Sequence, residues 1–229
     1  MTGKTTSAIA GESTGATAVK SGKRPRQLGR SAAAVPVVSV VGATGLVGTE
    51  IARILELRGF PARRLVLYSS GRKAERKVQV SGEDQPVHPF TIEAFRRLSG
   101  GGGRGVCFLA AGGEFSREYA RRIAAAGHVV IDNSSAFRMD PGVPLVVPEV
   151  NPQDLARHDG LIANPNCSTI QMVVALAPLH KVWTLKKVVV ATYQAVAGAG
   201  LAATGELAAQ SLAVLEGRLF RPSALPHRI

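Results

Sequence analysis

The sequence predicts an α/β fold in which helices cover both faces of a parallel sheet. Runs of β-branched and other apolar residues alternate with segments whose apolar residues recur at helical spacing. The first run is almost entirely valine, which is typical of a strand buried on both faces. A glycine-rich turn joins this run to the first helical segment. We expect strands at residues 37–41, 65–68, 105–110 and 129–131.

Helices are expected between these strands. After the glycine-rich turn, apolar residues recur on one helix face at Val47, Ile51, Ile54 and Leu55. Residues 111–113, which include two glycines, follow the third strand and lead into a helix over residues 116–126. Residues 99–104 contain four consecutive glycines and predict a flexible loop between two such units.

The second half of the chain predicts further elements. Residues 160–163 form a short, extended apolar segment, and residues 169–176 have the pattern of a helix. Residues 188–193 are rich in β-branched side chains and predict a strand that ends at Gln194 and a glycine-rich turn.

The composition limits the function classes. A hydrophobic content of 45% allows a sizeable core, and two cysteines give no disulfide framework. No apolar run approaches the roughly 18 residues that a membrane span needs. Residues 1–34 hold six Lys/Arg and one acidic residue, a charge of +5 that leaves +7 for the rest. Because aromatic residues make up only 5% of the chain, base-stacking surfaces are scarce, and we expect no nucleic-acid partner.

Residues 1–34 have too few apolar side chains to offset the entropy of ordering, so we expect a disordered basic extension. Its basic, hydroxyl-rich and nearly acid-free composition also fits a transit peptide, although it lacks the apolar core of a secretory signal. We therefore expect a cytoplasmic protein. A plastid or another organelle is the alternative if the extension is a transit peptide.

A dinucleotide site is predicted at Gly42-x-x-Gly45-x-x-Gly48, because these glycines follow a strand and open a helix. In Rossmann-type domains the first glycine permits the tight turn and the second lets backbone approach the pyrophosphate. The third lets the helix pack closely on the strand. A glycine-rich turn without a ligand is the alternative.

The end of the second strand indicates which dinucleotide binds. An NAD site usually has an acidic residue there, whereas this chain has Ser69-Ser70-Gly71-Arg72-Lys73. Hydroxyl groups and a guanidinium suit the 2′-phosphate of NADP. A solvated surface turn is the alternative.

Three further segments carry candidate chemistry. Cys167 lies between an extended segment and a helix, where the helix dipole and unpaired N–H groups favour the nucleophilic thiolate. Arg138, in the polar loop after the fourth strand, is suited to bind a substrate anion, and Gln194 to orient a carbonyl. The alternatives are a buried cysteine, a surface ion-pair partner and a satisfied edge residue.

Together these motifs resemble the aspartate-semialdehyde dehydrogenase family, from Val37 to the end of the chain. NPNCST and YQAVAGAG are specific to that family, whereas N-acetyl-glutamyl-phosphate reductase has a different sequence around its cysteine. Usual members have serine where this chain has Ala197. The motifs occur in the order GATGLVG (42–48), SSGRK (69–73), LAAGG (109–113), DNSSAFR (132–138), VPLVVPEVNP (143–152), NPNCST (164–169) and TYQAVAGAG (192–200).

The resemblance implies roles for these residues. Cys167 would form an acyl-thioester, Gln194 would orient the acyl group, and Arg138 with Asn133 would bind the substrate and its phosphate. The implied reaction is NADPH-dependent reductive dephosphorylation of 4-phospho-L-aspartate to L-aspartate 4-semialdehyde, in lysine, threonine and methionine biosynthesis, by a homodimer. The implied cofactor-binding residues are Gly42, Thr44, Gly45, Leu46, Val47, Gly48, Ser70, Gly71, Arg72, Ala197 and Gly198.

The family's general acid/base is a histidine in a Gly-His-Ser motif, with an arginine shortly before it. None of the five histidines here lies in that motif. The second domain is therefore expected to be incomplete and the activity impaired. The expected organisation is a disordered extension (1–34), an NADP-binding domain (35–165) and an incomplete α+β catalytic and dimerisation domain (166–229). The alternatives are an N-acetyl-glutamyl-phosphate reductase-like enzyme, a non-catalytic NADP-binding module and nucleic-acid binding through the extension.

Overall fold

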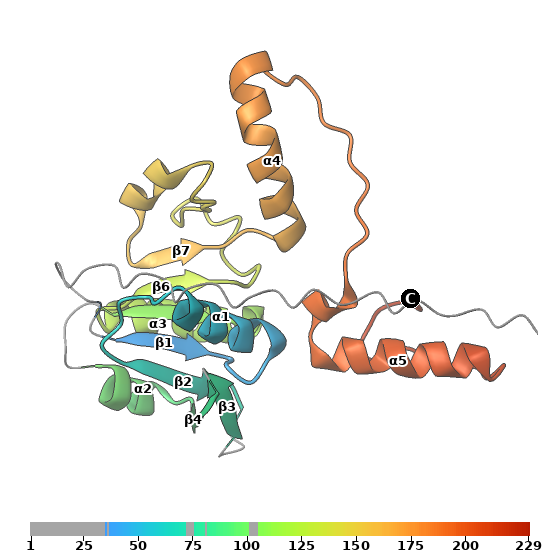
Figure 1. Ribbon diagram of the computed structural model, residues 1–229, viewed down its shortest axis with the longest axis horizontal. Coiled ribbons are helices and arrows are strands. Elements are labelled where there is room, and N and C mark those ends of the chain that lie inside the picture. The colour runs from blue at the N-terminus through green and yellow to red at the C-terminus, as the bar shows by residue number, and fades with distance from the viewer. Residues whose placement is uncertain (1–34, 36, 72–75, 81, 101–104) are drawn as a thin grey trace, which may run out of the picture.

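The computed structural model describes residues 35, 37–71, 76–80, 82–100 and 105–229 (Figure 1). The predicted extension over residues 1–34, and Arg72 and Lys73 of the predicted NADP-selecting turn, lie outside these residues.

A seven-stranded sheet in the order β3-β4-β2-β1-β5-β6-β7 forms the centre of the molecule. Every pairing is parallel except that of β3 with β4, which form an antiparallel hairpin at one edge. This sheet confirms the predicted fold class. The strands are β1 (Val38–Val41), β2 (Leu65–Ser69), β3 (Arg76–Val80), β4 (Glu83–Pro89), β5 (Val106–Leu109), β6 (Val129–Asp132) and β7 (Leu161–Ala163).

Helices pack on both faces of the sheet. Alternate residues of β1 point to opposite faces, so Val41 belongs to one core cluster and Val40 to the other. The Val40 cluster includes Ala52 of α1, and the Val41 cluster includes Phe95 of α2 and Ile123 of α3. The α-helices are α1 (Leu46–Leu57), α2 (Ile92–Ser99), α3 (Gly113–Ala125), α4 (Cys167–Trp183) and α5 (Leu201–Leu215); η1 (Pro152–Arg157) and η2 (Val196–Ala199) are 3-10 helices.

The chain after β7 leaves the sheet (Figure 1). Helix α4 projects away from it, and an extended segment then leads to η2 and α5. The strand predicted over residues 188–193 is wrong, because the described residues contain no neighbouring strand with which this segment pairs. Its valines are exposed, Val189 at 85%.

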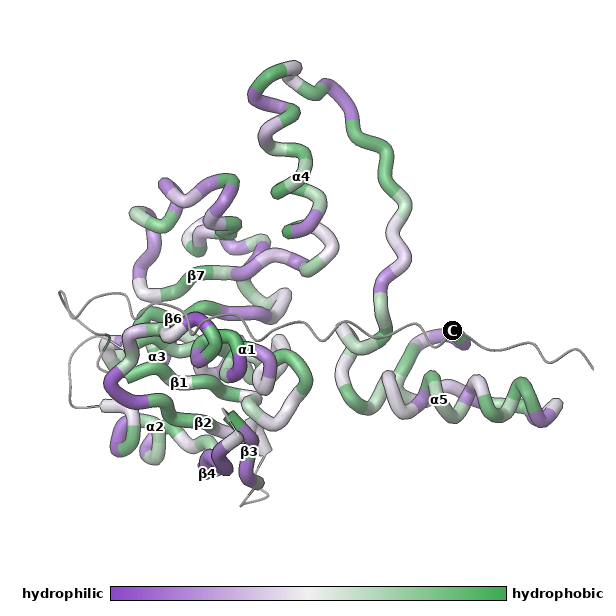
Figure 2. The backbone as a smooth tube through the Cα atoms, in the orientation of Figure 1, coloured by the Kyte–Doolittle hydropathy of each residue, from purple (hydrophilic) through white to green (hydrophobic). Residues whose placement is uncertain are grey.

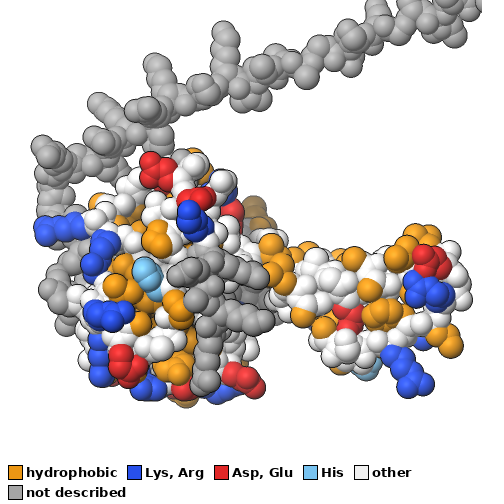
Figure 3. Space-filling model, turned by 90° about the horizontal axis from the view of Figure 1, so that it is seen from below, with side chains coloured by type: hydrophobic (Ala, Val, Ile, Leu, Met, Phe, Trp, Pro, Cys, Tyr) orange, Lys and Arg blue, Asp and Glu red, His pale blue; other side chains and the backbone are white. Residues whose placement is uncertain are grey.

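Apolar side chains are exposed throughout this C-terminal part. Figure 2 shows hydrophobic residues along α4, the extended segment and α5. No residue of α4 is buried, and Trp183 is 69% exposed. Figure 3 shows hydrophobic side chains spread over α5 and its surroundings, at the right of that view. Surfaces of this kind are typical of segments that pack against further protein.

Candidate functional site

The glycine-rich turn after β1 has the geometry of a phosphate-binding turn. Gly42 has φ +86°, a backbone conformation that residues other than glycine rarely adopt, and its N–H donates to the Tyr68 carbonyl (2.9 Å). A Cβ on Gly48 would lie 2.6 Å from the Gly42 carbonyl carbon and 2.8 Å from Ala43 Cα. Close contact between α1 and the turn therefore requires glycine at position 48.

The N-terminus of α1 is open for an anion. Gly45 is the N-cap and provides no side-chain hydrogen bond to the first turn of the helix. The N–H groups at a helix start have no partner within the helix, and phosphates bind there. Leu46 and Val47 are 49% and 44% exposed although they are apolar, which fits residues that a ligand covers. Thr44 lies in the same turn, so the residues present fit a dinucleotide pyrophosphate.

The end of β2 lies beside this turn, because β1 and β2 are parallel and Val41 pairs with Tyr68. Ser69 donates its hydroxyl to the Gly71 carbonyl (3.1 Å), and Ser70 and Gly71 are exposed. The predicted ribose-side residues Ser70 and Gly71 thus adjoin the glycine-rich turn.

A second glycine turn lies at the same edge of the sheet. Gly112 follows β5, has φ +90° and is the N-cap of α3, again without a side-chain hydrogen bond. The sequence predicts this turn, but it predicts no ligand role for Gly112 or Gly113. The signal was the position of two glycines between a strand end and a helix start.

Cys167 is exposed and is the first residue of α4. Asn166 caps this helix: its Oδ1 accepts from the N–H groups of Ser168 (3.0 Å) and Thr169 (3.4 Å). The other cysteine, Cys107, is buried in β5, and this burial strongly raises the pKa of its thiol. Cys167 is therefore the accessible thiol, and the alternative of a buried cysteine is wrong.

Arg138 and Asn133 lie next to the segment that leads to Cys167. Arg138 Nε donates to the Asn164 carbonyl (2.9 Å), and its Nη2 donates to the Asn133 carbonyl (3.1 Å). Asn164 Nδ2 donates to Asn133 Oδ1. These contacts join the loop after β6 to the loop after β7, because the two strands are parallel neighbours.

Below this loop, a buried carboxylate fixes the end of β6. Asp132 is fully buried and accepts from the hydroxyls of Ser116 (2.6 Å) and Ser134 (2.7 Å). The Ser134 N–H also donates to it (3.0 Å). Asp132 thereby connects α3, β6 and the loop that carries Arg138.

The predicted residues of the 194–200 segment form a separate group. Gln194 Nε2 lies close to Gly198, since a Cβ on Gly198 would be 2.8 Å from it. Ala197 and Gly198 belong to η2, which leads into α5. Within the described residues, no hydrogen bond joins this segment to Cys167, Asn133 or Arg138.

Four histidines of the chain lie in places other than the segment around Cys167. His158 Nδ1 accepts from the Gly160 N–H (2.9 Å), and His180 lies in the last turn of α4, away from Cys167. His227 is exposed near the end of the chain. His128 is buried, and this burial lowers the pKa of its imidazole.

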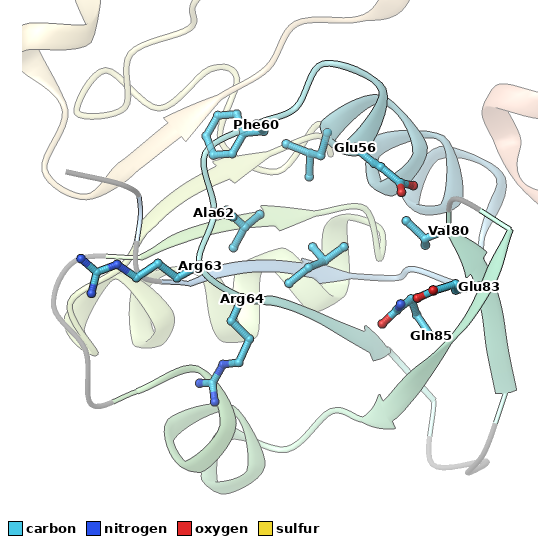
Figure 4. A pocket seen from close by; sticks show the side chains of 11 residues that line it. Glu56, Phe60, Ala62, Arg63, Arg64, Val80, Glu83 and Gln85 are labelled. Atoms are coloured by element: carbon cyan, nitrogen blue, oxygen red, sulfur yellow. The ribbon is translucent and has the colours of Figure 1, made fainter. Parts of the chain in front are cut away.

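A cavity of about 290 Å³ lies near the amino ends of β1 and β2, away from the glycine-rich turn at their carboxyl ends (Figure 4). Val38 and Leu65, the first residues of β1 and β2, line it, together with Leu55 and Phe60. None of the candidate site residues lines this cavity.

Two family models match the chain. The model described as "Semialdehyde dehydrogenase, NAD binding domain" matches residues 37–158, more than half of the chain. The model described as "Semialdehyde dehydrogenase, dimerisation domain" matches residues 176–229. The chain belongs to the semialdehyde dehydrogenase family.

Its similar curated relatives are aspartate-semialdehyde dehydrogenases. That of Bacillus subtilis is 48% identical over 189 residues, which are 82% of this chain and 53% of the relative. That of Aquifex aeolicus is 47% identical over 195 residues, 84% of this chain and 56% of the relative. The chain thus spans about half the length of the curated relatives it matches.

Solved structures agree with this assignment. Aspartate semialdehyde dehydrogenase II from Vibrio cholerae, complexed with ASA, has a TM-score of 0.74 and 38% identity, over 85% of this chain and 57% of that one. The enzyme from Candida albicans with NADP has a TM-score of 0.52 and 25% identity, over 65% of this chain and 48% of that one. Among the described helices, none combines the length and apolarity needed to cross a membrane.

Proposed function

We propose that this chain carries the dinucleotide site and the cysteine nucleophile of an NADP-dependent aspartate-semialdehyde dehydrogenase. The activity is the reduction of 4-phospho-L-aspartate to L-aspartate 4-semialdehyde with release of phosphate. The observation that carries the proposal is the exposed Cys167 at the start of α4, shortly after Asn164, whose carbonyl accepts from Arg138 Nε (2.9 Å). Several curated aspartate-semialdehyde dehydrogenases are 40–48% identical to the chain, and this disfavours the N-acetyl-glutamyl-phosphate reductase alternative.

The first chemical step uses this chain's own residues. The Cys167 thiolate attacks the acyl carbon, the bond from that carbon to the phosphate oxygen breaks, and phosphate leaves with the electron pair. The product is a thioester on Cys167. Negative charge develops on the acyl oxygen during the attack, and backbone N–H groups stabilise such charge. The Cys167 N–H suits this role, because Asn166 Oδ1 accepts from Ser168 and Thr169 instead.

Arg138 and Asn133 would bind the phosphate end of the substrate. Two nitrogens of the Arg138 guanidinium, Nε and Nη2, donate to main-chain carbonyls, which fixes the orientation of its plane. The guanidinium keeps its positive charge and its remaining N–H groups for a phosphate oxygen. Gln194 would orient the acyl group once the 194–200 segment approaches Cys167.

The bound cofactor would supply a hydride to the thioester carbon. The Gly42–Gly48 turn would hold its pyrophosphate, with Ala197 and Gly198 near the nicotinamide. We favour NADP over NAD because Ser70 and Arg72 suit a 2′-phosphate, and because the similar Candida albicans enzyme was solved with NADP. The dimerisation-domain match supports a homodimer. The domain limits (1–34, 35–165 and 166–229), a cytoplasmic location and the organelle alternative remain proposals from the sequence.

The test is phosphate-dependent reduction of NADP with L-aspartate 4-semialdehyde. The purified chain is assayed alone and mixed with a separately produced second half of a close relative, each beside a Cys167→Ala control. We expect NADPH formation that depends on phosphate and disappears in the control. Tight NADPH binding without turnover, both alone and in the mixture, would favour the non-catalytic module instead.

A further inference from the structure

One residue, Asn164, attaches the segment that leads to Cys167 to the rest of the site. Its N–H donates to the Asp132 carbonyl (2.8 Å), and its carbonyl accepts from Arg138 Nε (2.9 Å). Its side-chain Nδ2 donates to Asn133 Oδ1. All three partners belong to the end of β6 and the loop after it. The main chain and the side chain of Asn164 therefore bind the same loop.

The residues that follow leave few other attachments before Cys167. Pro165 has no N–H, and a residue before proline is confined to extended backbone, so Asn164 cannot join the helix. Asn166 accepts hydrogen bonds from within α4, through Oδ1 and through its carbonyl from Ile170 (2.9 Å). Within the described residues, Asn164 is thus the last hydrogen-bonded link between the sheet-side loop and the start of α4.

We propose that Asn164 is a positioning residue: its amide holds the loop of Arg138 at a fixed spacing from the Cys167 thiol. This inference rests on the proposed function, in which Arg138 binds the phosphate and Cys167 attacks the acyl carbon. In an acyl phosphate these two centres are joined through one oxygen, so the two protein groups must keep a matching spacing. Small errors in such positioning cost large factors in rate.

The test uses inorganic phosphate as the probe and alkylation of Cys167 by iodoacetamide as the readout. Phosphate held by Arg138 beside the thiol should slow alkylation, and the half-protecting concentration is measured by peptide mass spectrometry. In Asn164→Ala we expect this concentration to rise between about two- and tenfold, the range that loss of one hydrogen bond produces. Asn133→Ala, which also removes a proposed phosphate-binding side chain, should raise this concentration at least as much, and the double variant should be no worse than Asn133→Ala alone.

The matched control is Asn151→Ala. Asn151 is also a loop asparagine, and its side chain makes three hydrogen bonds: Nδ2 donates to the Leu145 carbonyl (3.0 Å) and to Asp154 Oδ2 (2.8 Å), and Oδ1 accepts from the Val147 N–H (2.8 Å). Its loss should lower stability without changing phosphate protection. Equal protection in wild type and Asn164→Ala, or an equal shift in Asn151→Ala, would overturn the proposal.

A second measurement separates this inference from the proposed function. The free energies of urea unfolding of wild type, the Asn133→Ala and Asn164→Ala variants and the double variant form a double-mutant cycle. We expect the losses to be non-additive, and additive losses would overturn the attachment of Asn164 to Asn133. If phosphate did not protect Cys167 in wild type but the unfolding free energies were non-additive, the phosphate-binding role of Arg138 and the positioning role built on it would be contradicted. The attachment of Asn164 to Asn133 would still stand.

Discussion

Two glycines of the turn between β1 and α1 should fail in different ways when a methyl group is added. At Gly48 the new Cβ would lie 2.6 Å from the Gly42 carbonyl carbon and 2.8 Å from Ala43 Cα, far inside van der Waals contact with backbone. At Gly45 the nearest atom would be the Gly42 oxygen at 3.4 Å, and the backbone there (φ −86°, ψ 163°) is accessible to alanine. We therefore expect Gly48→Ala to disturb the fold and Gly45→Ala to disturb the ligand site.

The expected magnitudes follow from this geometry. Overpacking of a close contact costs about 1–3 kcal/mol, so Gly48→Ala should lower the Tm by roughly 2–4 °C for each kcal/mol. Gly45→Ala should change the unfolding free energy by less than about 1 kcal/mol, because alanine is only a weaker N-cap than glycine. However, its methyl group lies where the backbone would approach a pyrophosphate, and the Kd for NADPH should rise by about tenfold or more.

The assay combines urea unfolding with a fluorescence titration of NADPH on the same preparations. Gly205→Ala in α5 is the control, since no atom lies within 4 Å of a Cβ at that position and Gly205 is not a candidate site residue. The reasoning would be refuted if Gly48→Ala unfolded like wild type, or if Gly45→Ala bound NADPH as tightly as wild type does.

Three further predictions concern titratable groups. Iodoacetamide should label Cys167 and spare Cys107 in the native protein, because burial raises the pKa of the Cys107 thiol, whereas labelling of both thiols in the folded state would contradict the structure. The N–H groups of Ala224 and Ser223 lower the pKa of Glu206 to about 2, so its stabilising effect should be present above pH 4.5 and lost as the pH falls toward 2. Glu206→Gln should accelerate hydrogen exchange of residues 223–225 at neutral pH, and unchanged exchange would argue against this anchor. Burial lowers the pKa of His128, so the unfolded chain binds its proton first and stability should fall as the pH drops below about 6.5; in urea titrations this slope should be smaller for His128→Leu than for wild type, and an unchanged slope would contradict it.

The sequence predicted the central part of the sheet well because its strands are short, continuously apolar and separated by helices. It gave no prediction for the β3–β4 hairpin, where Val78, Val80 and Val87 are buried among charged and polar residues. Alternation at Val78 and Val80 was the available signal, but the polar composition of β4 obscured it. Helix α2 was also not predicted, although Thr91 caps it by accepting from the Ala94 N–H (3.0 Å).

Only part of the candidate site could be predicted from the sequence. The loop of Asn133 and Arg138 lies beside the segment that leads to Cys167, as expected for the carboxyl ends of parallel neighbouring strands, while the roles of these residues stay predictions. The hydrogen bonds of Asn164 could not be inferred, because they depend on the register of β6 against β7. The strand over residues 188–193 failed for a related reason: β-branched residues favour extended backbone, but a strand also needs a partner that composition does not specify.

The central claim is that Cys167 is acylated by an acyl phosphate. The direct measurement is peptide mass spectrometry of the chain after incubation with 4-phospho-L-aspartate, without nucleotide, together with the phosphate released. We predict an aspartyl adduct on Cys167, stoichiometric phosphate release and neither in Cys167→Ala. An unmodified Cys167 in folded chain that iodoacetamide still alkylates would contradict the account.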